Sequence, residues 1–318
     1  MRAIVIHETG GPEVLKLDEV PDPKPDAGQV VVRTEAIGVS YTEAALRAGG
    51  FPLPAQLPAV FGFEAAGVVT ETGDGVDKAL TGRRVVIMNT GLGTYAEYAT
   101  APADTLAFIP DDMSSQQAVA VANFGAVALC LLRKANLTGN ETVLVEAAAG
   151  GVGGYLTQLA HELGANTVIA TAGNQAKREY ADSIGADQVI DHSAPDWAGQ
   201  LTDDSVDAVF ESFSGDSTGK LLPKLTPGTG RIMLYGFLQG PPTITAMDLL
   251  RRGLTLVGCG GMPGWLDRVM AARHDVFQLV ASGHLTPRID SILPLEEAAS
   301  AHQRFDTRTA IGKIILTP

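Results

Sequence analysis

The chain has 318 residues, which is long enough for two domains with sizeable cores. Apolar residues make up 45% and charged residues 19%, as in ordinary globular proteins, and the formal net charge of −13 argues against nucleic acid or an anionic membrane as a partner. The two cysteines, Cys130 and Cys259, exclude a disulfide framework and a four-thiolate zinc site, so we expect a reducing, cytoplasmic location. We also expect no secretory signal and no run of transmembrane length.

The first 120 residues have the pattern of a mostly β domain. Short runs rich in β-branched residues, such as AIVI, QVVVRTEAIGV and RRVVIM, are separated by turn signals such as ETGGP and PDPKPDAG. The chain returns to this texture after about residue 284 and ends in the strand-like GKIILTP. We therefore expect a discontinuous, partly barrel-like domain built from residues 1–120 and 285–318.

Residues 121–284 alternate predicted strands with predicted helices. The strand TVLVEA precedes a helix with leucines on one face that ends at Gly164, and the strand TVIAT precedes a helix that ends at Gly185. Four more predicted strands follow, with the sequences QVIDH, VDAVFES, GRIMLYGF and LTLVGCG. Such alternation is typical of a doubly wound parallel sheet, so the predicted fold class is α/β.

A glycine cluster lies between the first of these strands and its helix. In VEAAAGGVGGYLTQLA, Ala148, Gly150 and Gly153 stand at the three positions of the dinucleotide fingerprint G-x-G-x-x-G. Its glycines permit a tight turn, a close approach of the pyrophosphate and close helix–strand packing. The free N–H groups at the start of the helix, at about Gly151–Gly153, would then face phosphate, and Gly150, Gly151 and Val152 are the candidate cofactor-binding residues of this turn. The alternative is a purely structural turn.

The second strand indicates which dinucleotide is bound. An NAD site needs an acidic residue at the end of this strand, and residues 167–178 contain none. The segment instead carries donors and cations suited to a 2′-phosphate, namely Thr171, Asn174, Lys177 and Arg178. His192, just after the third strand, could flank the same pocket. A solvated helix face is the alternative for Lys177 and Arg178, but the missing acid favours NADPH.

The stretch NETVLVEAAAGGVGGYLTQLAHELGA resembles the quinone oxidoreductase, or zeta-crystallin-like, branch of the medium-chain dehydrogenase/reductase family, although His161 stands where Lys, Arg or Ser is usual. The resemblance continues through LPAVFGFEAAGVV, ATAGNQAKREYADSIGADQVIDH and PLEEAASAHQRFDTRTAIGKIILTP. It implies a GroES-like catalytic domain and a Rossmann domain over residues 121–284. It also implies NADPH, hydride transfer to a quinone or an electron-poor C=C bond, and a homodimer formed through the Rossmann sheet edge, here the LTLVGCG strand.

The resemblance also bears on zinc. Alcohol dehydrogenase relatives bind catalytic zinc at positions that look like Ser40 and Phe63 here; serine is a poor zinc ligand and phenylalanine cannot be one. The remaining histidines are scattered, so we interpret them as surface or structural residues: His7, His161, His274, His284 and His302. We therefore predict a site without metal. Simple ketone chemistry would lack its Lewis acid, whereas a quinone or enone needs only hydrogen-bond donors.

The resemblance places the acceptor pocket around residues of the first domain. The candidates are Ser40 and Tyr41 for catalysis and Phe51, Phe63 and Asn123 for the pocket lining. Tyr41 is a candidate donor to a developing enolate, or else an aromatic wall. Ala45, Phe51 and Val127 stand where relatives often carry hydroxyl groups, which suggests an apolar or larger substrate. Glu43 and Arg47, four residues apart, are expected to pair with each other.

On the cofactor side, Gly236, Phe237 and Gly260 fall where the family approaches the nicotinamide, and Cys259 is expected to pack rather than react. We therefore expect an NADPH-dependent oxidoreductase that reduces a quinone or another α,β-unsaturated carbonyl compound. The alternatives are a pathway-specific enoyl or enone reductase and a non-catalytic NADPH-binding sensor.

Overall fold

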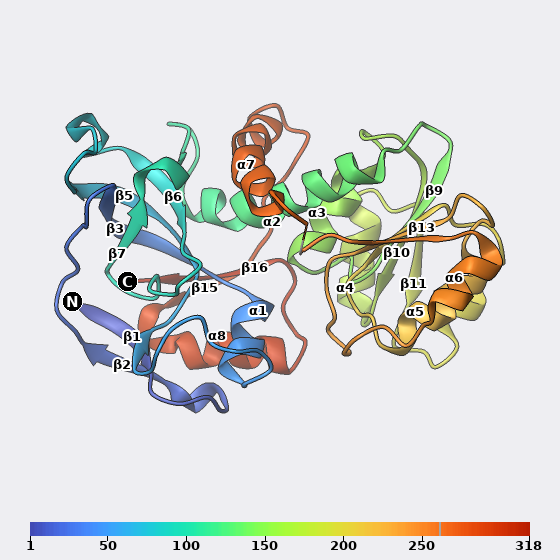
Figure 1. Cartoon of the computed structure of the whole chain (residues 1–318), viewed down its shortest axis with the longest axis horizontal. Coiled ribbons are helices and arrows are strands. Elements are labelled where there is room, and N and C mark those ends of the chain that lie inside the picture. Colours follow the sequence, from blue (N-terminus) through green and yellow to red (C-terminus); the bar gives the residue numbers. More distant parts are fainter. Residues whose placement is uncertain (261) are drawn as a thin grey trace. The chain divides into compact units, whose positions relative to one another are not determined.

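The computed structural model describes residues 1–260 and 262–318, and the chain divides into two compact units (Figure 1). The first unit comprises Met1–Asn123 and Thr286–Pro318, and the second Phe124–Leu285. The boundaries expected from sequence, after residues 120 and 284, lie within three residues of these. The first boundary falls inside a long helix, α2 (Ser115–Ala135), where no change in sequence texture marks it.

The first unit is built on a seven-stranded sheet that contains both early and late parts of the chain. Along the sheet the order is β15 (Ile289–Pro294), β16 (Lys313–Thr317), β3 (Gln29–Val39), β5 (Glu64–Thr72), β6 (Arg84–Met88) and β8 (Ala107–Phe108), with β7 (Tyr98–Pro102) also paired to β3. Because β16 pairs antiparallel with β3, placing Leu316 opposite Ile37, the late segment completes this unit.

A smaller sheet and short helices complete the first unit. The sheet has the order β2 (Leu15–Glu19), β1 (Arg2–Ile6) and β4 (Ala59–Val60). The helices are α1 (Tyr41–Arg47) and α8 (Ala298–Asp306), with single 3₁₀ turns at 12–14, 78–80, 103–105 and 295–297. Alternate residues of β3 and β5 fill the core together with Phe61 and Tyr95. This mostly β unit agrees with the GroES-like domain that was expected.

The second unit is a six-stranded parallel sheet. Its order is β11 (Gln188–Asp191), β10 (Ala165–Ala172), β9 (Glu141–Val145), β12 (Ala208–Glu211), β13 (Arg231–Leu234) and β14 (Thr255–Gly258). Every neighbouring pair is parallel, so the predicted doubly wound α/β sheet is confirmed. The strand order reverses between β9 and β12. In open sheets of this kind, ligands bind outside the carboxyl ends of the strands at such a switch point.

Helices connect the strands of the second unit: α3 (Gly151–Ala160), α4 (Gln175–Ser183), α5 (Asp216–Leu221), α6 (Ala246–Arg252) and α7 (Trp265–Ala281). Two 3₁₀ turns lie at 197–200 and 222–224. The expectation that no run reaches transmembrane length is wrong for α2, whose 21 residues are long and apolar enough to cross a membrane. Within the protein, however, 78% of its most apolar window is buried, and a core helix passes the same test.

Candidate active site

The glycine turn joins β9 to α3 in the second unit. The N-cap residue is Gly150, which has no side chain to satisfy the first N–H groups of α3, so these remain available to an anion. The tight part of the turn lies earlier than the fingerprint suggests, since Ala147 and not Ala148 has a positive φ, of 51°. Backbone hydrogen bonds brace the turn, from Gly150 N–H to the Ala147 carbonyl (2.7 Å) and from Ala148 N–H to the Thr171 carbonyl (2.9 Å).

Gly153 allows α3 to pack directly on the turn. A Cβ atom at this position would clash with the Ala147 carbonyl oxygen. It would also lie 2.8 Å from the Ala147 carbonyl carbon and 3.0 Å from the backbone carbonyl oxygen of Glu146. Only glycine therefore fits. The turn keeps the close helix–strand approach that the third glycine of a dinucleotide fingerprint provides, and the residues present fit a pyrophosphate.

Thr171 and His192 lie together at the ends of β10 and β11. The Thr171 hydroxyl is 3.1 Å from His192 Nδ1 and 3.4 Å from the backbone nitrogen of Ala147. The His192 ring stands edge-on to Phe213, with ring centroids 4.7 Å apart. Two of the predicted cofactor residues are thus brought together beside the glycine turn.

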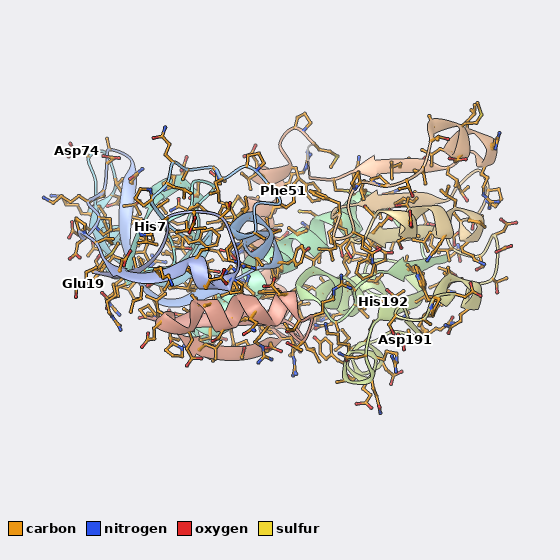
Figure 2. The ribbon with its side chains drawn as sticks, turned by 90° about the horizontal axis from the view of Figure 1, so that it is seen from below. His7, Glu19, Phe51, Asp74, Asp191 and His192 are labelled. Carbon is orange, nitrogen blue, oxygen red and sulfur yellow. The ribbon has the colours of Figure 1, made fainter. Side chains whose placement is uncertain are left out.

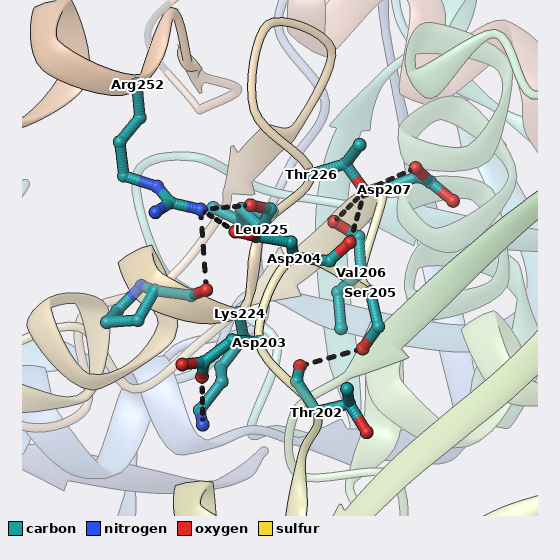
Figure 3. A network of polar contacts seen from close by, with 11 residues as sticks. Thr202, Asp203, Asp204, Ser205, Val206, Asp207, Lys224, Leu225, Thr226 and Arg252 are labelled. Carbon is teal, nitrogen blue, oxygen red and sulfur yellow. Dashed lines mark hydrogen bonds and ion pairs between the residues drawn. The ribbon is translucent and has the colours of Figure 1, made fainter.

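The cationic segment after β10 contains one arrangement that the sequence did not predict. Asn174 caps α4 by accepting the Lys177 backbone N–H at 3.0 Å. The Arg178 guanidinium instead donates to Asp191 at 2.5 Å, and Figure 2 labels Asp191 beside His192. Hydrogen bonds from Ser193 and the charge of Arg178 hold the pKa of Asp191 below its usual range. Residues 167–178 lack a carboxylate, but the neighbouring strand β11 supplies one. This carboxylate, that of Asp191, forms an ion pair with Arg178.

Three further cofactor candidates follow β13 and β14. A Cβ atom at Gly236 would lie 2.8 Å from the Ser212 carbonyl oxygen, so this glycine permits a close backbone approach. Phe237 is exposed over half of its surface, and Gly260 has open space around it. Cys259 is buried, and burial raises the pKa of its thiol to about 11, so the thiol stays protonated near neutral pH.

Two buried carboxyl groups flank the switch point, and sequence reasoning missed both. Glu146 directly follows β9, and its carboxylate accepts the N–H groups of Ser212 and Phe213, both at 2.9 Å, and the Ser217 hydroxyl at 2.6 Å. Glu211 ends β12 and accepts the Thr218 hydroxyl at 2.5 Å, while its second oxygen is buried without a partner among the described residues. Burial raises the pKa of Glu146, and it raises that of Glu211 to about 7.

In the first unit, Ser40 is the N-cap of α1. Its hydroxyl accepts the Glu43 N–H at 3.2 Å, and the Glu43 carboxylate accepts the Ser40 N–H at 2.6 Å and the Phe63 N–H at 2.8 Å. The fully buried Glu43 thereby joins two of the predicted site residues, and burial raises its pKa to about 7. The adjacent Tyr41 is 43% exposed. Phe51 and Phe63 are half-buried and pack on the core of this unit.

The expected Glu43–Arg47 pair is wrong, because each residue binds elsewhere. Arg47 is buried, and it donates to Asp306 of α8 at 3.0 and 3.1 Å and to the Gly10 carbonyl at 2.9 Å. Helical spacing predicts only local partners, whereas this arginine crosses to a helix from the late segment of the chain.

Asn123 belongs to a second buried group beside Glu43. Its side-chain amide donates to Glu64, which also forms a buried ion pair with Lys313 of β16. The Asn123 carbonyl oxygen is buried without a partner in the described part of the chain.

The histidines that were interpreted as surface or structural residues are either buried in the core or exposed at the surface. His302 is buried against the Tyr95 hydroxyl (3.1 Å), and burial lowers its pKa to about 3. His7, His161 and His284 are in exposed contacts with carboxylates. Over residues 1–260 and 262–318, no three His, Cys, Asp or Glu side chains are grouped to hold a metal ion.

Comparison with known proteins shows the family. A family model described as "Alcohol dehydrogenase GroES-like domain" matches residues 26–111, and one described as "Zinc-binding dehydrogenase" matches residues 184–316. The chain is 34% identical over 332 residues to 2-haloacrylate reductase of a Burkholderia species. The aligned region covers 99% of this chain and 98% of that protein. It is 31% identical over 343 residues to the synaptic vesicle membrane protein VAT-1 homolog of Rattus norvegicus, covering 100% of this chain and 84% of that protein.

Among solved structures, the quinone oxidoreductase of Escherichia coli complexed with NADPH matches with a TM-score of 0.90 at 31% identity, and 100% of each chain is covered. The chain therefore belongs to the quinone oxidoreductase branch of the medium-chain dehydrogenase/reductase family. The resemblance found in its glycine-turn segment is confirmed.

Proposed function

We propose that this protein is an NADPH-dependent oxidoreductase that transfers a hydride to a quinone or another activated α,β-unsaturated carbonyl compound. The observation that carries the proposal is the glycine turn at the switch point of a parallel sheet, with Lys177 in the helix that follows the next strand. A solved relative that is similar over its whole length is complexed with NADPH, which supports this cofactor.

NADPH supplies the hydride when it is bound, and the chain supplies binding and orientation. The free N–H groups at the start of α3 would hold the pyrophosphate, and Lys177 with Thr171 and His192 would line the adenosine end. A quinone or enone spreads the incoming charge onto its own oxygen, where a hydrogen-bond donor is sufficient. Ser40 and Tyr41 are the proposed donors. The Ser40 oxygen already accepts the Glu43 N–H, so its hydrogen remains available to donate.

Lys177→Ala is expected to weaken NADPH binding by about 10- to 100-fold, because a charge-assisted hydrogen bond to the 2′-phosphate is worth roughly 1.5–3 kcal/mol. NADH affinity should stay nearly constant, since NADH lacks that phosphate. Titration of protein fluorescence with each nucleotide measures both constants. Arg178→Ala is the matched control and should cost NADPH binding less, because Asp191 already holds this guanidinium. Equal losses of NADPH and NADH in Lys177→Ala would contradict the assignment.

We further propose that the reaction needs no metal. Although one matched family model is described as a zinc-binding dehydrogenase, Ser40 caps α1 here and Phe63 offers no ligand atom. Activity is therefore expected to survive prolonged chelation, with elemental analysis finding no stoichiometric zinc. Loss of activity on chelation that added zinc restores would show this proposal to be wrong.

Alkene reduction is the second candidate. It is favoured by the similarity to a protein named 2-haloacrylate reductase and by the apolar Ala45, Phe51 and Val127. Following nicotinamide absorbance with matched quinones, enones and haloacrylates distinguishes the candidates. Oxidation by quinones supports the first proposal, and turnover of alkenes alone supports the second. Tight NADPH binding without oxidation by any acceptor would point to a non-catalytic sensor.

The proposed assembly is a homodimer through β14, in a cytoplasmic setting. β14 is an edge strand of the described sheet, and the preceding α6 leaves Met247 and Leu250 51% and 73% exposed. An open strand edge beside exposed apolar side chains is a surface that a second copy could cover. Sedimentation of the purified protein, compared with a Leu250→Glu variant, tests this assembly.

A further inference from the structure

Glu146 and Glu211 lie at the carboxyl ends of two adjacent strands at the switch point of the second unit. Glu146 follows β9 directly, Glu211 ends β12, and the Glu146 N–H donates to the carbonyl of Phe210 at 3.2 Å. Their side chains hold consecutive hydroxyl groups at the start of α5, those of Ser217 and Thr218. Both carboxyl groups are fully buried at the end of the sheet where a ligand is expected.

The two carboxyl groups are supported unequally. Glu146 accepts three hydrogen bonds, two of them from backbone N–H groups, and such bonds favour a charged carboxylate. Glu211 accepts only the Thr218 hydroxyl, and its buried second oxygen has no partner in the described chain. A charge on Glu211 is therefore less well stabilised than a charge on Glu146.

Burial and hydrogen bonds act on the pKa of both carboxyl groups, and the charge of Glu146 acts on that of Glu211. Tyr235, which follows β13, keeps its proton because burial and the Glu146 charge raise its pKa. The ring of His192 stands edge-on to the ring of Phe213, and the charged residues of α5, Asp216 and Lys220, are exposed. Burial, with a smaller contribution from the Glu146 charge, raises the pKa of Glu211 to about 7.

We propose that Glu211 takes up one proton from solvent when NADPH binds, so that binding is tighter at lower pH. The proposal rests on the proposed function, because it needs the dinucleotide at the switch point. The phosphate charges add to the field of Glu146, and like charges favour the neutral form of a buried carboxyl group. By linkage, a group that is ionised in the free protein and protonated in the complex makes binding weaker as pH rises.

Calorimetry of the intact protein tests the proposal. Titrating NADPH at about pH 8, above the second phosphate pKa of about 6, in two buffers of different ionisation enthalpy counts the protons taken up. The expected uptake approaches one, and the dissociation constant should rise by up to about tenfold per pH unit above pH 7. In Glu211→Gln the uptake should vanish and the affinity should no longer change over this range.

Glu43→Gln is the matched control, because Glu43 is the other buried carboxyl group with a pKa of about 7 and lies in the other unit. It should keep the uptake. If Glu211→Gln does not fold, Glu146→Gln provides the second variant, and its uptake at about pH 8 should fall because the charge acting on Glu211 is gone. Binding without proton uptake, or uptake lost only in Glu43→Gln, overturns this inference alone. Absence of NADPH binding overturns the proposed function as well.

Discussion

Gly153→Ala is expected to lower both NADPH affinity and stability severely. The new Cβ would press on the Ala147 carbonyl group and on the Glu146 oxygen, and these are backbone atoms that cannot rotate away. Either α3 moves off the sheet or the turn reshapes, and both outcomes displace the N–H groups that are proposed to bind the phosphates. We expect at least a 100-fold loss of affinity, or about 3 kcal/mol, by nucleotide titration, together with a lower melting temperature.

The neighbouring glycine provides the control for this variant. A Cβ atom at Gly154 would meet its nearest neighbours, the Ala148 oxygen and the Tyr180 hydroxyl, at 3.4 and 3.5 Å, which is ordinary contact. Alanine is favoured over glycine inside a helix by up to about 1 kcal/mol, so Gly154→Ala should be neutral or stabilising and should bind NADPH normally. If the two variants behaved alike, the steric argument for Gly153 would fail.

Lys313→Met is expected to destabilise the first unit by about 3–5 kcal/mol, because it leaves the Glu64 carboxylate buried without its cation. Both side chains of this pair are almost fully buried, and the lysine tethers β16 to β5 at the strand position that joins the late segment to the rest of the sheet. Denaturant unfolding measures the loss. The double variant Lys313→Met with Glu64→Leu should recover part of it, since it removes the unpaired charge as well.

An exposed ion pair provides the control for the buried pair of Lys313 and Glu64. Arg133 and Asp275 lie 2.8 Å apart with side chains about half exposed, at 53% and 46%. Pairs of this kind contribute roughly 0–1 kcal/mol, so Arg133→Met should barely move the unfolding midpoint. Equal losses from Arg133→Met and Lys313→Met would mean that burial is not the cause.

The features that were predictable from sequence are those set by local patterns. Strand–helix alternation and the position of the glycine turn were sufficient to identify the parallel sheet and the helix that begins at this turn. The capping roles of Asn174 and Ser40 were not predicted, although each residue directly precedes the helix that it caps. The roles of the proposed catalytic and cofactor residues remain predictions, and Lys177→Ala and Gly153→Ala test the cofactor side.

Contacts between distant segments could not be predicted in the same way. The partner of Arg47 is Asp306, 259 residues away, and that of Arg178 lies on the neighbouring strand. Glu146 and Glu211 were missed because a glutamate at a strand end usually reaches water. Here, both side chains are buried and accept hydroxyl groups from the start of α5.

The pairing of β16 with β3 also fixes the order in which the two units can be completed during synthesis. The central strand of the first unit, at residues 29–39, waits for a partner at residues 313–317, and the whole second unit is encoded between them. Because domains generally fold as units while the chain emerges, the second unit can be finished while the first is still missing a strand. During that interval one edge of β3 is open and the buried Glu64 carboxylate lacks its lysine, so the growing first unit carries an unpaired strand edge and an uncompensated charge.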